Sequence, residues 1–302
     1  MDLPNIPVGE ATHPHDANLP IDAQEPFGSS PAANLVLRSS DSVDFHVLEG
    51  LMRLVSPHFD SLFPLNNPHS KDGRAVIRVA EDSKTMHQLL SIIYHHIDEV
   101  DIQDFELYTS IVKAVRVYRM AIIESKLRKQ ALVSRLDASE SLRMYALATT
   151  LQWGDVAKAA ALNTLPEPLD EISDLKELSW ITGADLYRLV SFRFRCGDAA
   201  CRSLKEDRGF THHGLDRWQS YWDGYGIQKG ITSKGLFKKI KACPRGSTVD
   251  ELYASELEKI GRWNQDFSIN VKGAAFHGMM ECRSSIGKVI EEAISKVPLD
   301  MP

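Results

Sequence analysis

The chain has 302 residues and a formal net charge of −6, with 43% apolar and 25% charged residues. This length is sufficient for two domains, and the composition is ordinary for a globular protein. The acidic balance gives no general attraction to nucleic acid or to an anionic membrane, and no segment has the roughly 20 apolar residues that span a bilayer. No secretory signal is visible and the four cysteines are too few for a disulfide framework, so we expect a cytoplasmic or nuclear protein with no membrane segment.

Residues 1–32 are predicted to be a disordered tail. The prolines of this segment lie among acidic and small polar residues, at Pro4, Pro7, Pro14, Pro20, Pro26 and Pro31. Proline fixes φ and removes a backbone donor, and the segment offers little apolar surface to bury. We therefore expect the folded part of the chain to begin at residue 33.

Two short strands joined by a turn are expected next. Apolar residues alternate with other residues in 35–38 and again in 43–47. Alternation with period two is typical of a strand with one buried face. Between the two runs lie Ser39, Ser40, Asp41 and Ser42, which favour a turn. The pattern predicts a β-hairpin.

Helical spacing follows the hairpin. One apolar stripe is formed by Leu51, Leu54, Val55, Phe59, Leu62 and Phe63. Because Pro57 would interrupt a continuous helix, we expect Ser56 to cap a second short helix that begins at Pro57. A third strand is predicted at 76–79 and further helices at 86–94, 107–118 and 122–132. This order predicts an α+β domain at 33–133, with a small sheet covered by helices.

These residues resemble a BTB/POZ domain, in particular the group of such domains that is abundant in mushroom-forming fungi. The matching positions, in the family's order, are Leu35, Leu37, Arg38, Ser39, Ser40, Asp41, Phe45, His46, Ser56, Pro57, Phe59, Leu62, Phe63, Glu81, Asp82, Ser83, Leu89, Leu90, Ile93, Tyr94, Ala114, Tyr118 and Met120. Each match is weak by itself, but their ordered sum over residues 35–120 is fairly specific. As motif residues of the protein-binding module we take Asp41, Phe45, His46, Ser56, Pro57, Phe59, Tyr94 and Tyr118.

The resemblance implies a module that binds other proteins and performs no chemistry. BTB domains often act as adaptors for cullin-type ubiquitin ligases, or as assembly platforms in transcription and channel proteins. We expect the contact surface on the helical face contributed by Leu51 to Phe63 and Leu107 to Tyr118. A cullin-type scaffold is one such partner, and the resemblance alone does not choose among these roles.

Homodimerisation is left open. Many BTB dimers exchange an amphipathic N-terminal helix and hold an acidic and a basic residue in a pocket at the subunit interface. Here Ala32 and Ala33 stand where the family usually has acidic residues, and Val47 stands where it usually has lysine. No amphipathic helix precedes Leu35. The sequence therefore gives little support to an exchanged dimer.

The remainder of the chain is expected to be helical. Residues 134–204 show alanine-rich helical spacing that Pro166 and Pro168 interrupt, and they predict an all-α extension of the BTB-like domain. Residues 205–302 are less regular, with an aromatic and glycine-rich run at 212–225. Near the end, Ile286, Ile290 and Ile294 indicate a terminal helix. We expect this region to be mostly helical, and whether it forms an independent domain is left open.

A metal or thiol site is the weakest of the chemical possibilities. Cys196, Cys201, His212 and His213 are the candidate zinc ligands, since thiolates and imidazoles suit zinc. No Cys-x-x-Cys pair is present, and free cysteine is commonly a small buried hydrophobe. Cys196 lies beside two arginines, but no base follows at a defined spacing for a cysteine nucleophile. We predict no metal and no cofactor.

A basic segment at 229–245 carries the alternative function. It contains no acidic residue and holds Lys229, Lys234, Lys238, Lys239, Lys241 and Arg245. Together with nearby aromatic residues it could serve a nucleic-acid-associated transcriptional regulator, while a solvated lysine-rich loop is the plainer interpretation. None of the common phosphate-loop, dinucleotide, nucleophile-elbow or zinc-protease motifs is present. The principal prediction is therefore a non-enzymatic scaffold or adaptor.

Overall fold

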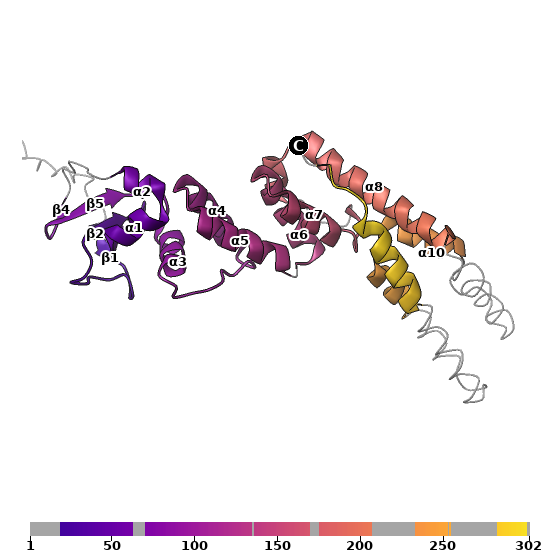
Figure 1. The fold of residues 1–302 in the computed structure, drawn as a ribbon, viewed down its shortest axis with the longest axis horizontal. Coiled ribbons are helices and arrows are strands. Elements are labelled where there is room, and N and C mark those ends of the chain that lie inside the picture. Colours follow the sequence, from indigo (N-terminus) through magenta and orange to yellow (C-terminus); the bar gives the residue numbers. More distant parts are fainter. Residues whose placement is uncertain are drawn as a thin grey trace, which may run out of the picture. The chain divides into compact units, whose positions relative to one another are not determined.

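The computed structural model describes residues 19–62, 70–134, 136–169, 175–206, 233–252, 254 and 283–300 (Figure 1). The chain divides into two compact units, residues 1–130 and residues 131–302. The first unit holds a β-sheet together with helices, and helices make up the regular structure described in the second. The chain is therefore α+β, as the sequence predicts.

The sheet of the first unit has five short strands. They are β1 (Ile21–Asp22), β2 (Leu35–Arg38), β3 (Val43–Val47), β4 (Ser70–Lys71) and β5 (Arg74–Arg78), in the spatial order β1-β3-β2-β5-β4. The antiparallel pairing of β2 with β3 confirms the predicted hairpin, and Ser42 adopts a φ of 64° in its turn. Strand β5 pairs with β2 in parallel and begins two residues before the predicted third strand. Alternation did not predict β1 and β4, which have only two residues each.

Five helices accompany the sheet: α1 (Glu49–Val55), α2 (Pro57–Ser61), α3 (Ser83–Ile93), α4 (Phe105–Val117) and α5 (Ala121–Val133). The predicted break between α1 and α2 is confirmed, because Ser56 Oγ accepts a hydrogen bond from the Phe59 N–H at 3.1 Å and Pro57 is the first helical residue. Helix α3 has Asp82 as its N-cap residue. Its apolar face, with Leu89 and Leu90 fully buried, contributes to the core.

The prediction of a disordered tail is wrong for residues 19–32. The Ile21 N–H donates to the Ser42 carbonyl at 3.1 Å and the Ala23 N–H donates to the Asp44 carbonyl at 2.8 Å, so this segment lies along the open edge of β3. Phe27 is only 2% exposed. The open edge and one buried aromatic side chain compensate for the proline-rich composition. We call residues 19–33 the N-terminal strap; residues 1–18 lie outside the described residues.

The second unit begins with an alanine-rich helix pair, α6 (Ala138–Thr150) and α7 (Gly154–Asn163). Asp137 and Glu140 form a capping box at the start of α6. After residues 170–174, which are not described, come a short 3-10 helix (η2, Lys176–Trp180) and then α8 (Gly183–Glu206) and α10 (Ser233–Ala242). The regular elements described in the predicted all-α extension are thus all helices.

A last helix covers residues 283–295, as the spacing of isoleucines predicts. Ile286, Ile290 and Ile294 are each at most 1% exposed. None of the helices in the described ranges is both long enough and apolar enough to cross a membrane.

The strap can be tested by replacing Phe27 with alanine. We expect Phe27→Ala to lower the free energy of unfolding of the first unit by about 3–5 kcal/mol, because it removes a buried aromatic side chain. Leu19→Ala is the matched control, since Leu19 is 86% exposed and its loss should cost less than about 0.5 kcal/mol. Hydrogen exchange in urea measures the stability of the first unit. Tryptophan fluorescence would report only the second unit, because all five tryptophans lie there. Equal stability of the two variants would contradict the buried position of Phe27.

Candidate functional site

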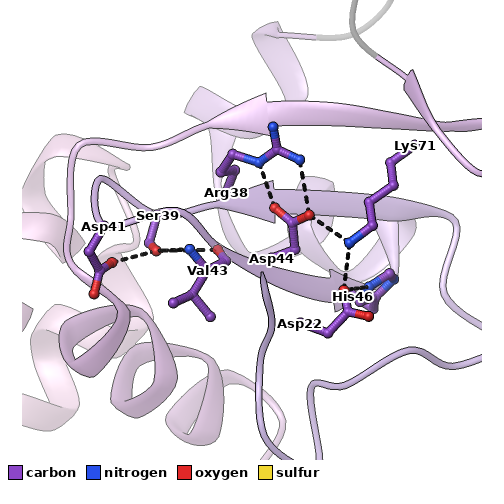
Figure 2. Close-up of polar contacts among 8 residues, drawn as sticks. All are labelled: Asp22, Arg38, Ser39, Asp41, Val43, Asp44, His46 and Lys71. Carbon is purple, nitrogen blue, oxygen red and sulfur yellow. Dashed lines mark hydrogen bonds and ion pairs between the residues drawn. The ribbon is translucent and has the colours of Figure 1, made fainter. Parts of the chain in front are cut away.

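Ionisable side chains from all five strands form one polar network on the sheet. Asp44 and His46 share a face of β3 because they are two residues apart. Around them lie Asp22 of β1, Arg38 of β2, Lys71 of β4 and Arg74 of β5. Figure 2 shows these groups except Arg74.

Asp44 is the centre of this network, and its side chain is fully buried. Arg38 donates two hydrogen bonds to it, from Nε at 2.6 Å and from Nη2 at 3.0 Å, and Lys71 Nζ donates a third at 2.8 Å. Burial alone would raise the pKa of Asp44, but the bonds from Arg38 and Lys71 outweigh it and hold that pKa below its ordinary value. The carboxylate is therefore charged and compensated by two cations.

His46 lies between a cation and a carboxylate. Arg74 Nη1 lies 3.0 Å from Nδ1, and Asp22 Oδ1 lies 2.9 Å from Nε2. A guanidinium group can only donate, so Nδ1 must accept and the ring proton sits on Nε2, which donates to Asp22. Lys71 also donates to Asp22 at 2.6 Å. The hydrogen bond from Lys71, which has the larger effect, and the one from His46 both lower the pKa of Asp22.

Lys71 joins the two edges of the sheet, because it lies in β4 and contacts Asp22 in β1. In a flat sheet these edge strands would lie roughly 19 Å apart, since neighbouring strands are spaced by about 4.8 Å. Lysine and aspartate side chains cannot bridge that distance together. The sheet must therefore curl toward the network, and the bonds of Lys71 stabilise the curl.

The groups of the network are bonded to one another. Both nitrogens of His46 are engaged, and the Asp44 carboxylate accepts from two cations. A general base needs a free lone pair within reach of a substrate proton, and His46 keeps none. Over the described ranges, no group of three or more histidine, cysteine or acidic side chains is placed to hold a metal ion.

Asp41 ties the hairpin turn to the start of α3. Its carboxylate accepts from the Ser83 N–H at 2.9 Å, from Ser83 Oγ at 2.6 Å and from Ser39 Oγ at 2.6 Å. Burial opposes ionisation, but the bonds from Ser39 and Ser83 prevail and lower the pKa of Asp41. This motif residue thus fixes one end of the helix that covers the sheet.

Ser56, Phe59 and Tyr118 meet where the break between α1 and α2 touches the end of α4. Ser56 Oγ donates to the Tyr118 carbonyl at 2.6 Å, and the rings of Phe59 and Tyr118 stack at 4.8 Å. The Tyr118 hydroxyl donates to Glu81, and burial together with this carboxylate raises the pKa of Tyr118. We call this contact the helix junction.

The motif residues therefore mostly make contacts inside the first unit, and Ser56, Phe59 and Tyr118 contact one another. Five of them, Phe45, His46, Ser56, Phe59 and Tyr118, are buried, and the Tyr94 hydroxyl accepts from the Leu48 N–H at 2.8 Å. Only Pro57 and Asp41 are exposed. A buried side chain cannot touch a partner. The buried motif residues therefore position the exposed residues that form the surface.

Three exposed apolar side chains lie close in sequence to the residues of the helix junction. Leu54 of α1 is 82% exposed, Val117 of α4 is 59% exposed and Ile122 of α5 is 84% exposed. Each lies within four residues of Ser56 or Tyr118, whose hydrogen bond joins the two segments. We call Leu54, Val117 and Ile122 the exposed apolar cluster.

Helical periodicity placed Leu54 on an apolar stripe, but its side chain is exposed. The apolar stripe does not continue across the break between α1 and α2 at Pro57. In α1 the side chain of Leu54 faces solvent, while that of Met52 is buried. In α5, Ile122 is exposed while Ile123, Leu127 and Ala131 are buried.

Cys196 does not have the properties of a nucleophile. Its thiol is fully buried, and burial raises its pKa to about 12 despite the arginines nearby. Those arginines are already engaged: Arg193 donates to the carbonyls of Thr164 and Glu167, and Arg195 pairs with Asp300 at 3.0 Å. A reactive cysteine needs the opposite combination of exposure and a lowered pKa.

The proposed zinc ligands are only partly placed. Cys196 and Cys201 are five residues apart on α8, so they point about 140° apart around the helix. Cys201 Sγ lies 3.7 Å from the Phe237 carbonyl. His212 and His213 lie outside the described residues.

The basic segment 229–245 is partly helical, and some of its cations form ion pairs. Lys229 is not described, whereas Lys238, Lys239 and Lys241 lie on α10. Lys241 pairs with Asp198 at 3.0 Å and Arg245 pairs with Glu291 at 3.2 Å. The expected solvated loop is a helix over Ser233–Ala242, and two of the segment's cations, Lys241 and Arg245, have acidic partners.

Replacement of Asp44 by asparagine tests the centre of the network. At about pH 7 we expect Asp44→Asn to lower the free energy of unfolding of the first unit by about 3 kcal/mol, because Arg38 and Lys71 lose their buried counter-charge. The pKa of Asp44 is lowered in the folded state, so its contribution is present above the unfolded value of about 3.9 and is lost as the pH falls through the folded value.

The difference between variant and wild type should therefore shrink below about pH 4. Hydrogen exchange in urea at several pH values measures it in the first unit, and tryptophan fluorescence of the second unit is the internal control. A difference that stayed constant down to about pH 3 would contradict the ion pairs as its cause.

No protein-family model and no curated protein matches this sequence. The likeness to BTB/POZ domains therefore rests on the ordered residues of 35–120 alone.

Proposed function

We propose that this chain is a non-enzymatic scaffold or adaptor built on a BTB/POZ-like domain, which acts in the cytoplasm or nucleus. In this role it recruits partners to a cullin-type ubiquitin ligase or to another regulatory complex. The helical second unit extends the module and presents further surface. No chemical step is assigned to the chain.

The exposed apolar cluster is the observation that carries this proposal. Large apolar side chains with 59–84% exposure favour binding, because the free energy falls when a partner covers them. Leu54 and Val117 fall within the two helical ranges that the family resemblance singles out as a contact surface. The cluster gives that surface specific side chains.

The rigidity of the helix junction supports the same proposal. Ser56, Phe59 and Tyr118 hold α2 and the end of α4 together through a buried hydrogen bond and a ring stack. Side chains that are fixed before binding lose less conformational entropy in a complex. The buried motif residues thus have a function in binding, although they touch no partner.

Binding of a purified cullin-type scaffold to the full chain tests the proposal. We expect titration calorimetry to detect a complex with the wild type, and we expect L54D/I122D to weaken it at least about tenfold, since two apolar contacts are replaced by charges. Both positions are exposed, so the fold should be retained.

L19D is the matched control, because Leu19 is equally exposed but lies on the N-terminal strap. Its affinity should equal that of the wild type. Absence of a complex with the wild type would contradict the ubiquitin-ligase role. Equal affinities of L54D/I122D and L19D would contradict the exposed apolar cluster as the contact surface.

A further inference from the structure

Helices α8 and α10 of the second unit lie side by side in antiparallel orientation (Figure 1). A Cβ atom on Gly197 would come within 2.4 Å of the Lys241 carbonyl oxygen, so only glycine allows this approach. One turn further on, Cys201 Sγ lies 3.7 Å from the Phe237 carbonyl. Residue 197 is thus level with residue 241, and residue 201 with residue 237.

Four cations surround an open hollow along this seam. The hollow has a volume of about 640 Å³ and is lined by Arg202 and Lys205 of α8 and by Lys238 and Lys241 of α10. Phe237 lies between them, with Lys205 Nζ 5.5 Å from its ring centroid. We call these four cations and Phe237 the cationic seam.

Only one of the four cations has a carboxylate partner among the described residues. Lys241 pairs with Asp198 at 3.0 Å, and this is the acidic group that lines the hollow. Arg202, Lys205 and Lys238 leave an excess of positive charge there. Like charges that converge on one hollow repel each other, and an anionic ligand would relieve that repulsion.

The spacing of the cations favours a linear ligand. Given the antiparallel alignment, Lys241 and Lys238 are level with residues 197 and 200 of α8, so the four cations extend over eight residues, or about 12 Å of helix. A single small anion cannot contact a row of this length. An extended chain of phosphates can, and the aromatic side chain at the centre suits a stacked base.

The net charge of the whole protein does not oppose such a ligand. The acidic excess lies in residues 1–130, whereas residues 131–302 contain equal numbers of acidic and basic side chains. The electrostatic attraction of the seam is therefore local and acts within about a Debye length.

We propose that the cationic seam binds the phosphate backbone of single-stranded nucleic acid. Arg202, Lys205 and Lys238 contact phosphates, and Phe237 offers an aromatic ring on which a base stacks. This site differs from the basic segment that the sequence indicates, because half of its cations come from α8. Lys239 of that segment does not line the hollow, and Arg245 pairs with Glu291. The site is independent of the exposed apolar cluster.

Fluorescence anisotropy with labelled oligo-dT and oligo-U tests this site in the full chain. Strands of about 12 nucleotides match the usual footprint of a single-strand groove. We expect binding at low salt, a Kd at least about tenfold higher for R202E/K238E, and no more than about a twofold change for K239E. K239E introduces the same charge on an exposed neighbour of Lys238 and is the matched control.

Two further measurements separate a phosphate site from general charge. R202A/K238A removes two phosphate contacts, so the slope of log K against log salt should decrease in magnitude by about 1.4. Bound strand should also slow alkylation of Cys201, which lines the hollow, with no effect on Cys243.

Three results would overturn the proposal. The first is the absence of binding to either strand at low salt. The second is an equal loss of binding in K239E and R202E/K238E. The third is displacement of the strand by an equal concentration of oligoglutamate, which would indicate an acidic protein segment as the ligand.

Discussion

The buried carboxylate of Asp44 is the constraint on which the first unit depends. An isolated charge of this kind costs many kcal/mol to remove from water, so the fold must supply cations. Arg38 comes from the neighbouring strand β2, but Lys71 comes from the opposite edge of the sheet. The sheet curls to bring Lys71 into place, and the same lysine then reaches Asp22 and fixes the N-terminal strap. One carboxylate thus links the hairpin, the short β4–β5 turn and the strap.

The surface on which the proposed function depends follows from a second set of buried contacts. Ser56 and Tyr118 join segments that are far apart in the sequence, and Asp41 and Tyr94 anchor the hairpin to α3. These residues account for the family resemblance because they position the helices. The exposed side chains at Leu54, Val117 and Ile122 need not follow any motif, which leaves them free to specify a partner. The fold and the specificity of binding therefore belong to different residues.

Much of this fold could be predicted from the sequence because it is local. The hairpin, the Ser56–Pro57 break and the stripes of α3 and α4 depend on periodicity and capping within a few residues. The strap could not be predicted, because its stability comes from the edge of β3 and from the pocket that receives Phe27. Alternation in 43–47 indicated a strand with one buried face, and only the distant Lys71 and Arg74 explain why Asp44 and His46 are buried as well. The cationic seam also needs two helices in register, which no pattern in one segment reveals.

Native-state hydrogen exchange of Lys71→Met measures most directly whether the network holds the strap and the curled sheet together. Methionine keeps much of the apolar stem and removes the charge that joins Asp22 to Asp44. We predict that the amides of Ala23 and His46, which form the bonds between the strap and β3, exchange at least about tenfold faster than in the wild type. The buried amides of α4 should exchange less than about threefold faster. Unchanged exchange at Ala23 and His46 would contradict the central place of Asp44 and its cations.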